Sequence, residues 1–289
     1  MRLAIIDGTV RPAHEATISV FDRGLLYGDS VLETLRTYGG RAFELGAHLT
    51  RLAQSLEAIA IALPDSREAF ETDINTALRV AQNDESVLRV IVTRGEGPGG
   101  LDPSQAGCPV RIVTIDALDP PSPRLLRHGI RTRTFRTIRA SDAVQSAKLT
   151  SYLASVLATR DARAAGADEA LILDSDGRVL EGTTFNVFAV IGTRLLTPPT
   201  GFGVLDGITR RIVLELAQLE GMTIELRAMT PDELGRSDEV FVTSTLRELV
   251  GVATVDEHRI AKTPGPWTQR LHNAFRRRAG APPPRYDDT

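Results

Sequence analysis

The sequence predicts an α/β protein of two domains, and three observations carry that prediction. The chain has 289 residues, more than one small hydrophobic core needs, because domains of about 150 residues are typical. Apolar residues recur at strand spacing in some stretches and at helical spacing in others. Leu118–Pro123 is rich in proline, which stiffens a chain and disfavours helix and central strand. We therefore expect a smaller N-terminal α/β domain at 1–118, a linker at 119–128, a larger C-terminal domain at 129–278 and a flexible tail at 279–289.

In the N-terminal domain, apolar runs of strand length are separated by helical patterns. The expected strands are Met1–Gly8, Val31–Tyr38, Val87–Thr93 and Pro109–Ile115. Apolar residues three or four apart predict two helices, the first ended by Pro64 and the second capped by Ser66. Their apolar faces consist of Leu49, Leu52, Leu56 and Ile59, and of Phe70, Ile74 and Leu78. Phe21–Ser30 and Gly95–Gly100 are expected loops, and the second lacks the lysine-serine pair of a phosphate-binding loop.

The C-terminal domain shows the same two patterns. In chain order, we expect a strand at 130–138, a helix from Leu149 through Tyr152 to Gly166, hairpins at 171–181 and 185–197, a helix from Gly207 to Gly221, and a strand at Glu239–Thr243 that turns at Ser244–Arg247. Glycine is the usual residue just past a helix C-terminus, which explains the two helix ends.

The bulk properties exclude several classes of protein. A formal charge of −3 and a pI near 6.0 give no reason to expect nucleic acid or an anionic membrane as a partner. We interpret the basic cluster Arg276–Arg278 as a solvated helix end. The apolar start is interrupted by Asp7, so it resembles neither a signal peptide nor a membrane span. Cys108 is the single cysteine and the histidines lack metal-site spacing, so we expect a cytoplasmic protein without a metal.

Two residues suggest a specific chemistry. Lys148 stands before a helix, and a lysine amine can bind an aldehyde covalently. Glu181 ends a strand, and a carboxylate against a pyridine nitrogen keeps that nitrogen protonated. The pair therefore suits an enzyme that uses an aldehyde cofactor. By composition alone, solvated side chains are the commoner interpretation of both residues.

Several ordered motifs resemble one known family. Ala147–Leu153, Gly166–Leu171 and Glu181–Phe188 are similar to the class IV pyridoxal-phosphate enzymes, and the match resumes at Thr197–Pro199 and Gly203–Arg210. That family holds branched-chain aminotransferases, D-amino acid aminotransferases and aminodeoxychorismate lyases. The resemblance implies fold type IV, with a barrel-like sheet in the C-terminal domain, pyridoxal phosphate as cofactor, and a homodimer.

The resemblance also implies roles for individual residues. Lys148 holds the cofactor and moves a proton, Glu181 is the partner of its pyridine nitrogen, and Tyr152 reaches its phenolic oxygen. The residues assigned to the cofactor's phosphate are Arg51, Ile208, Thr209 and Thr245. Gly207–Thr209 also opens a helix, whose free N–H groups favour an anion and which Thr209 is expected to cap. The residues assigned to the substrate are Tyr27, Arg94, Thr245 and Leu246.

These assignments predict a transaminase that moves an amino group from an amino acid to a 2-oxo acid. Tyr27 and Tyr152 resemble the branched-chain type. The segment Thr93–Leu101, however, lacks both the tyrosine-x-arginine pattern of branched-chain enzymes and the arginine and histidine with which D-amino acid enzymes bind a carboxylate. Glu33–Arg36 and Thr243–Glu248 resemble sequences of the lyase branch. A branched-chain or aliphatic donor is favoured, and aminodeoxychorismate lyase and D-amino acid transaminase remain the alternatives.

Overall fold

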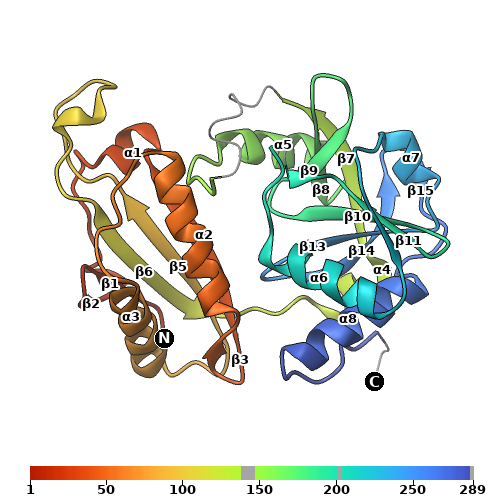
Figure 1. Cartoon of the computed structure of the whole chain (residues 1–289), viewed down its shortest axis with the longest axis horizontal. Coiled ribbons are helices and arrows are strands. Elements are labelled where there is room, and N and C mark those ends of the chain that lie inside the picture. Colours follow the sequence, from red (N-terminus) through yellow and green to blue (C-terminus); the bar gives the residue numbers. More distant parts are fainter. Residues whose placement is uncertain (138–146, 201–202, 287–289) are drawn as a thin grey trace. The chain divides into compact units, whose positions relative to one another are not determined.

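The computed structural model describes residues 1–137, 147–200 and 203–286, and the chain divides into two compact units (Figure 1). The first unit comprises Met1–Asp119 and Ala147–Ser151, and the second comprises Pro120–Ser146 and Tyr152–Thr289. The segment that carries Lys148 therefore belongs to the first unit, although it follows the proline-rich stretch in the chain.

A six-stranded antiparallel sheet forms the centre of the first unit, in the order β2-β1-β6-β5-β3-β4. Its strands are β1 Leu3–Ile6, β2 Thr9–Pro12, β3 Ser30–Tyr38, β4 Arg41–Ala42, β5 Ser86–Thr93 and β6 Val110–Ala117. The four predicted strands are confirmed. Gly39 and Gly40 turn the β3–β4 hairpin with φ of 57° and 72°, values that glycine adopts without a steric penalty.

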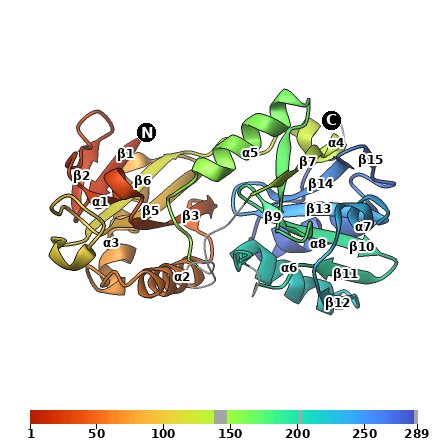
Figure 2. The same cartoon turned by 90° about the horizontal axis from the view of Figure 1, so that it is seen from above.

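Two helices cover one face of this sheet, as Figures 1 and 2 show. They are α2 Leu45–Ala58 and α3 Arg67–Ala81. A short α1 Arg23–Tyr27 lies in the expected loop Phe21–Ser30, and the 3₁₀ turn η1 Pro103–Gln105 follows the expected loop Gly95–Gly100. The core between helices and sheet includes Leu35, Leu52, Leu56, Phe70, Ile74 and Val90. Ser66 caps α3 by accepting a hydrogen bond from Ala69 N at 3.3 Å, as predicted. The expected end of the first helix at Pro64 is wrong, because Ala60 turns left-handed and Ile61 N bonds to Leu56 O.

The second unit contains a nine-stranded sheet that curls on itself. Its order is β12-β11-β10-β13-β14-β7-β8-β9, with β15 paired to β14. The strands are β7 Ile130–Arg136, β8 Glu169–Leu173, β9 Val179–Gly182, β10 Asn186–Ile191, β11 Arg194–Thr197, β12 Thr223–Leu226, β13 Glu239–Ser244, β14 Glu248–Val255 and β15 His258–Arg259. Gly182 N donates to Phe185 O at 2.7 Å, which joins the edge strand β9 to the start of β10. The predicted barrel-like sheet is confirmed.

The helices of the second unit correct three expectations. They are α4 Pro123–His128, α5 Leu153–Ala164, α6 Ile208–Leu219, α7 Pro231–Gly235 and α8 Pro266–Arg278. The first, α4, lies within the expected linker, because Pro123 occupies a first-turn position that needs no N–H. The second correction is that α5 starts at Leu153, so Leu149 lies outside it and Tyr152 is its N-cap. The third is that Gly207, rather than Thr209, occupies the N-cap position of α6.

The described part of the C-terminal tail contacts the rest of the second unit. Tyr286 Oη lies 2.7 Å from His272 Nδ1, and His272 Nε2 lies 2.7 Å from Glu248 Oε2. Burial raises the pKa of the Tyr286 phenol, and the Glu248 carboxylate raises it further. The tail is therefore anchored to α8 and β14 as far as Tyr286.

Tyr286→Phe is expected to destabilise the protein by about 1 kcal/mol, because the ring stays in place while His272 loses its hydroxyl partner. Urea unfolding at neutral pH measures the difference. Arg285→Ala, which changes an exposed neighbour, is the matched control. Equal unfolding midpoints for all three proteins would show that the anchor does not contribute to stability.

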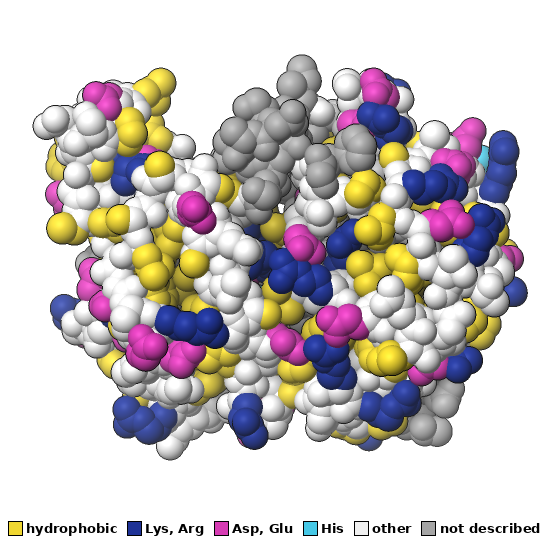
Figure 3. Space-filling view, in the orientation of Figure 1, with side chains coloured by type: hydrophobic (Ala, Val, Ile, Leu, Met, Phe, Trp, Pro, Cys, Tyr) yellow, Lys and Arg dark blue, Asp and Glu magenta, His cyan; other side chains and the backbone are white. Residues whose placement is uncertain are grey.

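The surface carries charges of both signs. On the face seen in Figure 3, Lys and Arg side chains are interspersed with Asp and Glu side chains. The arginines near the end of α8 pair with glutamates, as Arg276 does with Glu248 and Arg278 with Glu215. The basic cluster lies at a helix end, as interpreted from the sequence, but ion pairs neutralise part of its charge instead of solvent alone. Within the described ranges, no helix has the length and apolar character required to cross a bilayer.

Candidate functional site

The backbone at Lys148 is fixed from two sides within the first unit. Leu32 N on β3 donates to Lys148 O at 2.9 Å, and Lys148 N donates to Ser55 Oγ on α2 at 3.1 Å. Thr150 N adds a bond to Ser30 O at 3.2 Å, so the segment lies along β3. The Lys148 side chain, half-buried, therefore starts from a backbone that the strand and the helix both hold.

Arg51 lies one helical turn before Ser55, on the same face of α2. It is buried, and its Nε and Nη2 donate to the two carboxylate oxygens of Glu33 on β3, each at 2.7 Å. His48 Nδ1 lies 2.7 Å from Glu33 Oε2. Burial by itself raises the pKa of Glu33, but the hydrogen bonds from Arg51 and His48 outweigh it and lower that pKa to about 2. Glu33 is therefore a buried, ionised carboxylate.

This depressed pKa predicts a specific acid sensitivity. The folded-state pKa of Glu33 lies below the ordinary value of 4.5, so its contribution is present above pH 4.5 and is lost as the pH falls toward 2. The shift corresponds to about 3 kcal/mol. We expect the unfolding free energy of the parent to fall more steeply from pH 5 to pH 2 than that of Glu33→Gln. Glu57→Gln, at an exposed position of α2, is expected to show the same pH dependence as the parent. Parallel plots of unfolding free energy against pH for all three proteins would refute the lowered pKa of Glu33.

Tyr27 and Arg94 make contacts elsewhere in the first unit. Tyr27 Oη accepts a hydrogen bond from Gly100 N at 3.0 Å, so Tyr27 holds the glycine-rich loop. Arg94 Nε donates to Asp29 at 2.7 Å, and its Nη atoms donate to the Ile59 and Ala60 carbonyls at 2.7 and 2.8 Å. These bonds tie the end of β5 to the end of α2. The geometry thus gives Arg94 a structural role, and its assignment to the substrate stays a prediction.

In the second unit, the Glu181 carboxylate is held by a neighbouring loop and strand. Glu181 Oε2 accepts from Leu205 N at 3.0 Å and from Asn186 Nδ2 at 3.4 Å. Asn186 also donates to Leu205 O at 2.8 Å, which fixes the loop before α6. Burial lowers the pKa of the Arg210 guanidinium, while the charges of Asp206 and Glu181 raise it. A buried cation on α6 therefore lies within electrostatic range of Glu181.

The start of α6 is built to receive an anion. Gly207 is its N-cap and makes no side-chain cap bond, so the first N–H groups of the helix, at Ile208 and Thr209, have no intrahelical partner. A Cβ at Gly207 would lie 2.1 Å from Asn186 Oδ1, so a side chain there would displace Asn186 from its bonds to Glu181 and Leu205. The N–H groups of the first turn and the helix dipole favour a negatively charged group.

Thr245 and Leu246 lie in the turn between β13 and β14. The register of β10 against β13 pairs Asn186 with Thr243, so this turn follows the same end of the sheet as Asn186. The Thr243 hydroxyl is buried and has no hydrogen-bond partner among the residues described. The second unit therefore brings the Glu181 carboxylate, the start of α6 and the Thr245 turn to one end of its sheet.

Tyr152, the N-cap of α5, is half-buried. Ser155, in the first turn of α5, donates to Thr183 O at 3.2 Å. Thr183 follows Glu181 closely in the chain, so α5 starts near the segment that leaves β9.

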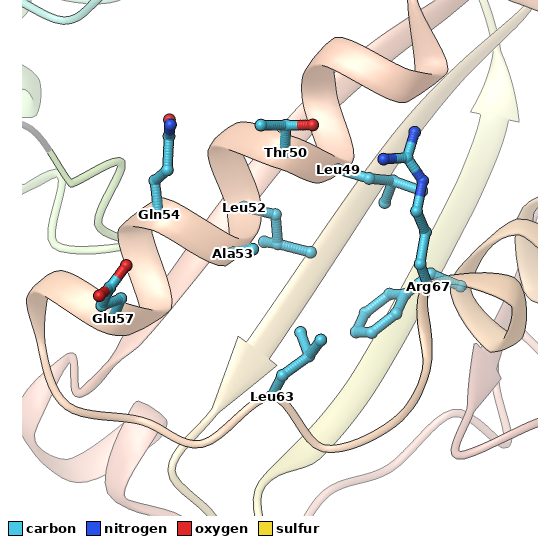
Figure 4. Close-up of a pocket in the computed structure, with 9 residues that line it drawn as sticks. Leu49, Thr50, Leu52, Ala53, Gln54, Glu57, Leu63 and Arg67 are labelled. Atoms are coloured by element: carbon cyan, nitrogen blue, oxygen red, sulfur yellow. The ribbon is translucent and has the colours of Figure 1, made fainter.

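Sequence reasoning missed Glu33, His48 and Arg210. The available signals were an acidic residue inside the apolar run of β3 and a histidine three residues before Arg51. A cavity of about 300 Å³ also lies between α2 and α3, lined by Leu49, Leu52, Ala53, Leu63, Phe70 and polar neighbours (Figure 4). It contains none of the predicted site residues. The described part of the chain has no group of three or more His, Cys, Asp or Glu arranged to hold a metal.

Comparison with known proteins identifies the family. The model of the family Amino-transferase class IV matches residues 30–255. A Methanocaldococcus jannaschii protein with the provisional name branched-chain-amino-acid aminotransferase is 39% identical over 94% of each chain. The D-alanine aminotransferase of Bacillus licheniformis is 31% identical over 94% of this chain and 95% of its own. The crystal structure of the T.th. branched-chain amino acid aminotransferase with pyridoxamine 5'-phosphate superposes with a TM-score of 0.91 at 30% identity, covering 97% of this chain and 95% of that one. The chain therefore belongs to the class IV aminotransferase family and is a pyridoxal-phosphate-dependent enzyme, as the motifs around Lys148 and Glu181 indicated.

Proposed function

We propose that this enzyme transfers the amino group of a branched-chain or other aliphatic amino acid to a 2-oxo acid. The observation that carries the proposal is the end of the second sheet, where a held carboxylate, Glu181, lies beside the anion-binding start of α6. Pyridoxal phosphate presents a pyridine nitrogen and a phosphate, and it supplies an electron-withdrawing ring when bound. One end of the sheet thus offers a partner for each of these two groups.

The cofactor's phosphate is assigned to donors that fit a dianion. They are the N–H groups of Ile208 and Thr209, the turn at Thr245, and the Arg51 guanidinium. The N-terminus of α6 supports this assignment, because its first N–H groups and the helix dipole favour an anion. Charge-assisted bonds to backbone N–H and guanidinium groups are the strong ones, so these residues retain the cofactor.

Lys148 and Glu181 carry the chemistry. The Lys148 amine would hold the cofactor and would move a proton at the substrate's alpha carbon. The bonds of its backbone to Leu32 and Ser55 fix the main chain from which that side chain extends. Glu181 keeps the pyridine nitrogen protonated, while Asn186 and Leu205 N orient its carboxylate. Tyr152 is assigned to the phenolic oxygen of the cofactor.

The substrate assignment rests on Tyr27, the turn at Thr245 and Leu246, and the relatives. Backbone N–H groups of that turn are assigned to the substrate carboxylate. The names of the M. jannaschii relative and of the T.th. structure favour a branched-chain donor. Arg94 donates a hydrogen bond to Asp29, so we propose that it contributes to the substrate site by holding the Asp29 loop and not by direct contact with the substrate.

We also propose that the enzyme works as a homodimer in the cytoplasm. On α5, Leu153 and Val156 are 69% and 58% exposed, so an apolar face of the second unit faces solvent. In the first unit, Val20 and Phe21 are each 65% exposed. Burying such groups against a second copy removes apolar area from water. The single cysteine, Cys108, is free and exposed, which suits a reducing compartment.

Val156→Lys is expected to shift the protein toward monomer, because it puts a charge into the apolar face of α5. Light scattering on a gel-filtration column measures the mass. Arg160→Lys, further along the same helix, is the control and is expected to behave as the parent. A parent that elutes as a monomer at all concentrations would refute the dimer.

A panel of amino donors, including both enantiomers of each, tests the proposed reaction. Each donor is mixed with the yellow holoenzyme, and the loss of its visible band reports the half-reaction. We expect L-valine, L-leucine and L-isoleucine to bleach the band fastest. A preference for D-alanine would replace the branched-chain assignment, and pyruvate release from aminodeoxychorismate without any half-reaction would replace transamination by the lyase reaction.

A further inference from the structure

We propose that Glu33 and His48 are positioning residues that hold the Arg51 guanidinium in the one orientation that serves the cofactor's phosphate. The inference rests on the proposed function, in which Arg51 binds that phosphate. It adds two residues to the site, neither of which is assigned to cofactor or substrate.

The geometry of the Glu33–Arg51 pair fixes the plane of the Arg51 guanidinium. Both carboxylate oxygens of Glu33 accept from Arg51, one from Nε and one from Nη2, and both distances are 2.7 Å. A guanidinium bound side-on at two atoms cannot rotate about its last bond without breaking both contacts. The remaining edge of the guanidinium therefore keeps a set direction relative to α2.

His48 fixes the carboxylate in turn. An ionised carboxylate only accepts hydrogen bonds, so His48 Nδ1, 2.7 Å from Glu33 Oε2, is the donor. His48 and Arg51 are three residues apart on α2 and clamp the same carboxylate from one helix face. The three side chains are 0%, 2% and 5% exposed, in the order Glu33, His48 and Arg51, so water does not compete for these bonds.

The same strand segment also holds Lys148. Leu32, next to Glu33 on β3, donates its N–H to the Lys148 carbonyl. On the other side, Ser55, one turn after Arg51, accepts from Lys148 N. The Glu33 clamp and the Lys148 backbone bonds thus fix the Arg51 guanidinium and the Lys148 main chain to the same strand and helix of the first unit.

If charge alone mattered, Glu33 would weaken phosphate binding, which is the opposite of the effect expected from positioning Arg51. A buried carboxylate next to an anion site repels a phosphate dianion, so removing its charge favours phosphate binding if charge alone matters. Loss of orientation disfavours binding, because a released arginine must be ordered again for each phosphate contact. The sign of the change in Glu33→Gln therefore separates positioning from simple charge.

The test compares pyridoxal phosphate with pyridoxal, which lacks the phosphate. The full chain of the parent, of Glu33→Gln and of Arg51→Ala is titrated with each compound, and absorbance reports binding. For Glu33→Gln we expect the affinity for pyridoxal phosphate to fall at least about tenfold and the affinity for pyridoxal to stay unchanged. The double variant Glu33→Gln/Arg51→Ala is expected to match Arg51→Ala, because Glu33 acts through Arg51.

The outcomes of this titration distinguish a failure of the positioning role from a failure of the proposed function. If Arg51→Ala binds pyridoxal phosphate as the parent does, the phosphate assignment of Arg51 is wrong and the inference falls with it, while the transaminase reaction still stands on its own donor panel. If Arg51→Ala weakens binding but Glu33→Gln leaves it unchanged or tightens it, only the positioning inference is overturned.

His48 supplies a second test that leaves the Glu33–Arg51 pair intact. Asparagine places a donor near the position of Nδ1, whereas leucine does not. We expect His48→Asn to retain most of the affinity for pyridoxal phosphate and His48→Leu to lose it, with pyridoxal affinity equal in both. If Glu33→Gln does not fold, equal pyridoxal phosphate affinities in the two His48 variants would overturn the proposal.

Discussion

Lys148→Ala is expected to lower kcat for amino transfer by at least about a thousandfold, because it removes both the cofactor attachment and the residue that moves the proton. General acid–base catalysis alone contributes about 10²- to 10⁴-fold. The measurement is single-turnover loss of the visible band with the best donor of the panel. A variant that retains a tenth of the parent's rate would remove Lys148 from its role.

The chain provides a matched control for this result, since it contains two lysines, Lys148 and Lys262. Lys262 is exposed and follows β15 in the second unit. Lys262→Ala is expected to react at the parent's rate. After borohydride treatment of the parent holoenzyme, peptide mapping is expected to find the cofactor on Lys148, and a cofactor mass on Lys262 would contradict the assignment.

Glu181→Gln is expected to slow the half-reaction at least about tenfold, a barrier increase of about 1.4 kcal/mol. Glutamine keeps an oxygen that accepts from Leu205 N, so the loop before α6 stays in place. It loses the negative charge that holds the proton on the pyridine nitrogen, and the ring then withdraws electrons less strongly. The variant is expected to retain bound cofactor.

Stopped-flow measurements of the visible band, at saturating donor, give this rate. Glu257→Gln, at an exposed position of the same unit, removes one negative charge without touching the Glu181 site and is expected to match the parent. A Glu181→Gln rate equal to that of Glu257→Gln would exclude Glu181 as the nitrogen's partner. Loss of the cofactor from Glu181→Gln would instead indicate that its main role is retention.

Elements with a strong periodic pattern were predictable from the sequence. The buried strand β5 and the helix α3 appear where their apolar spacing indicated, and Ser66 caps α3 as expected. Local chemistry decides such elements, because spacing, caps and turn residues act within a few positions of the chain. The short helix α4 was missed because prolines were taken to exclude a helix, whereas a first-turn proline is compatible with one.

The sequence by itself determined the family, the curled sheet and the identity of Lys148 and Glu181 as chemical candidates. Family motifs are recognised from residue types and their order along the chain, which requires no knowledge of tertiary contacts. Tertiary structure alone decided which partners these residues have. Glu33 and Arg51 are 18 positions apart, and Glu181 and Leu205 are 24 apart. Whether such side chains meet depends on strand register and helix placement, which set distances to a fraction of an ångström and which no local pattern encodes. The same holds for Arg94, whose bonds to the end of α2 exist only once β5 and α2 are packed together.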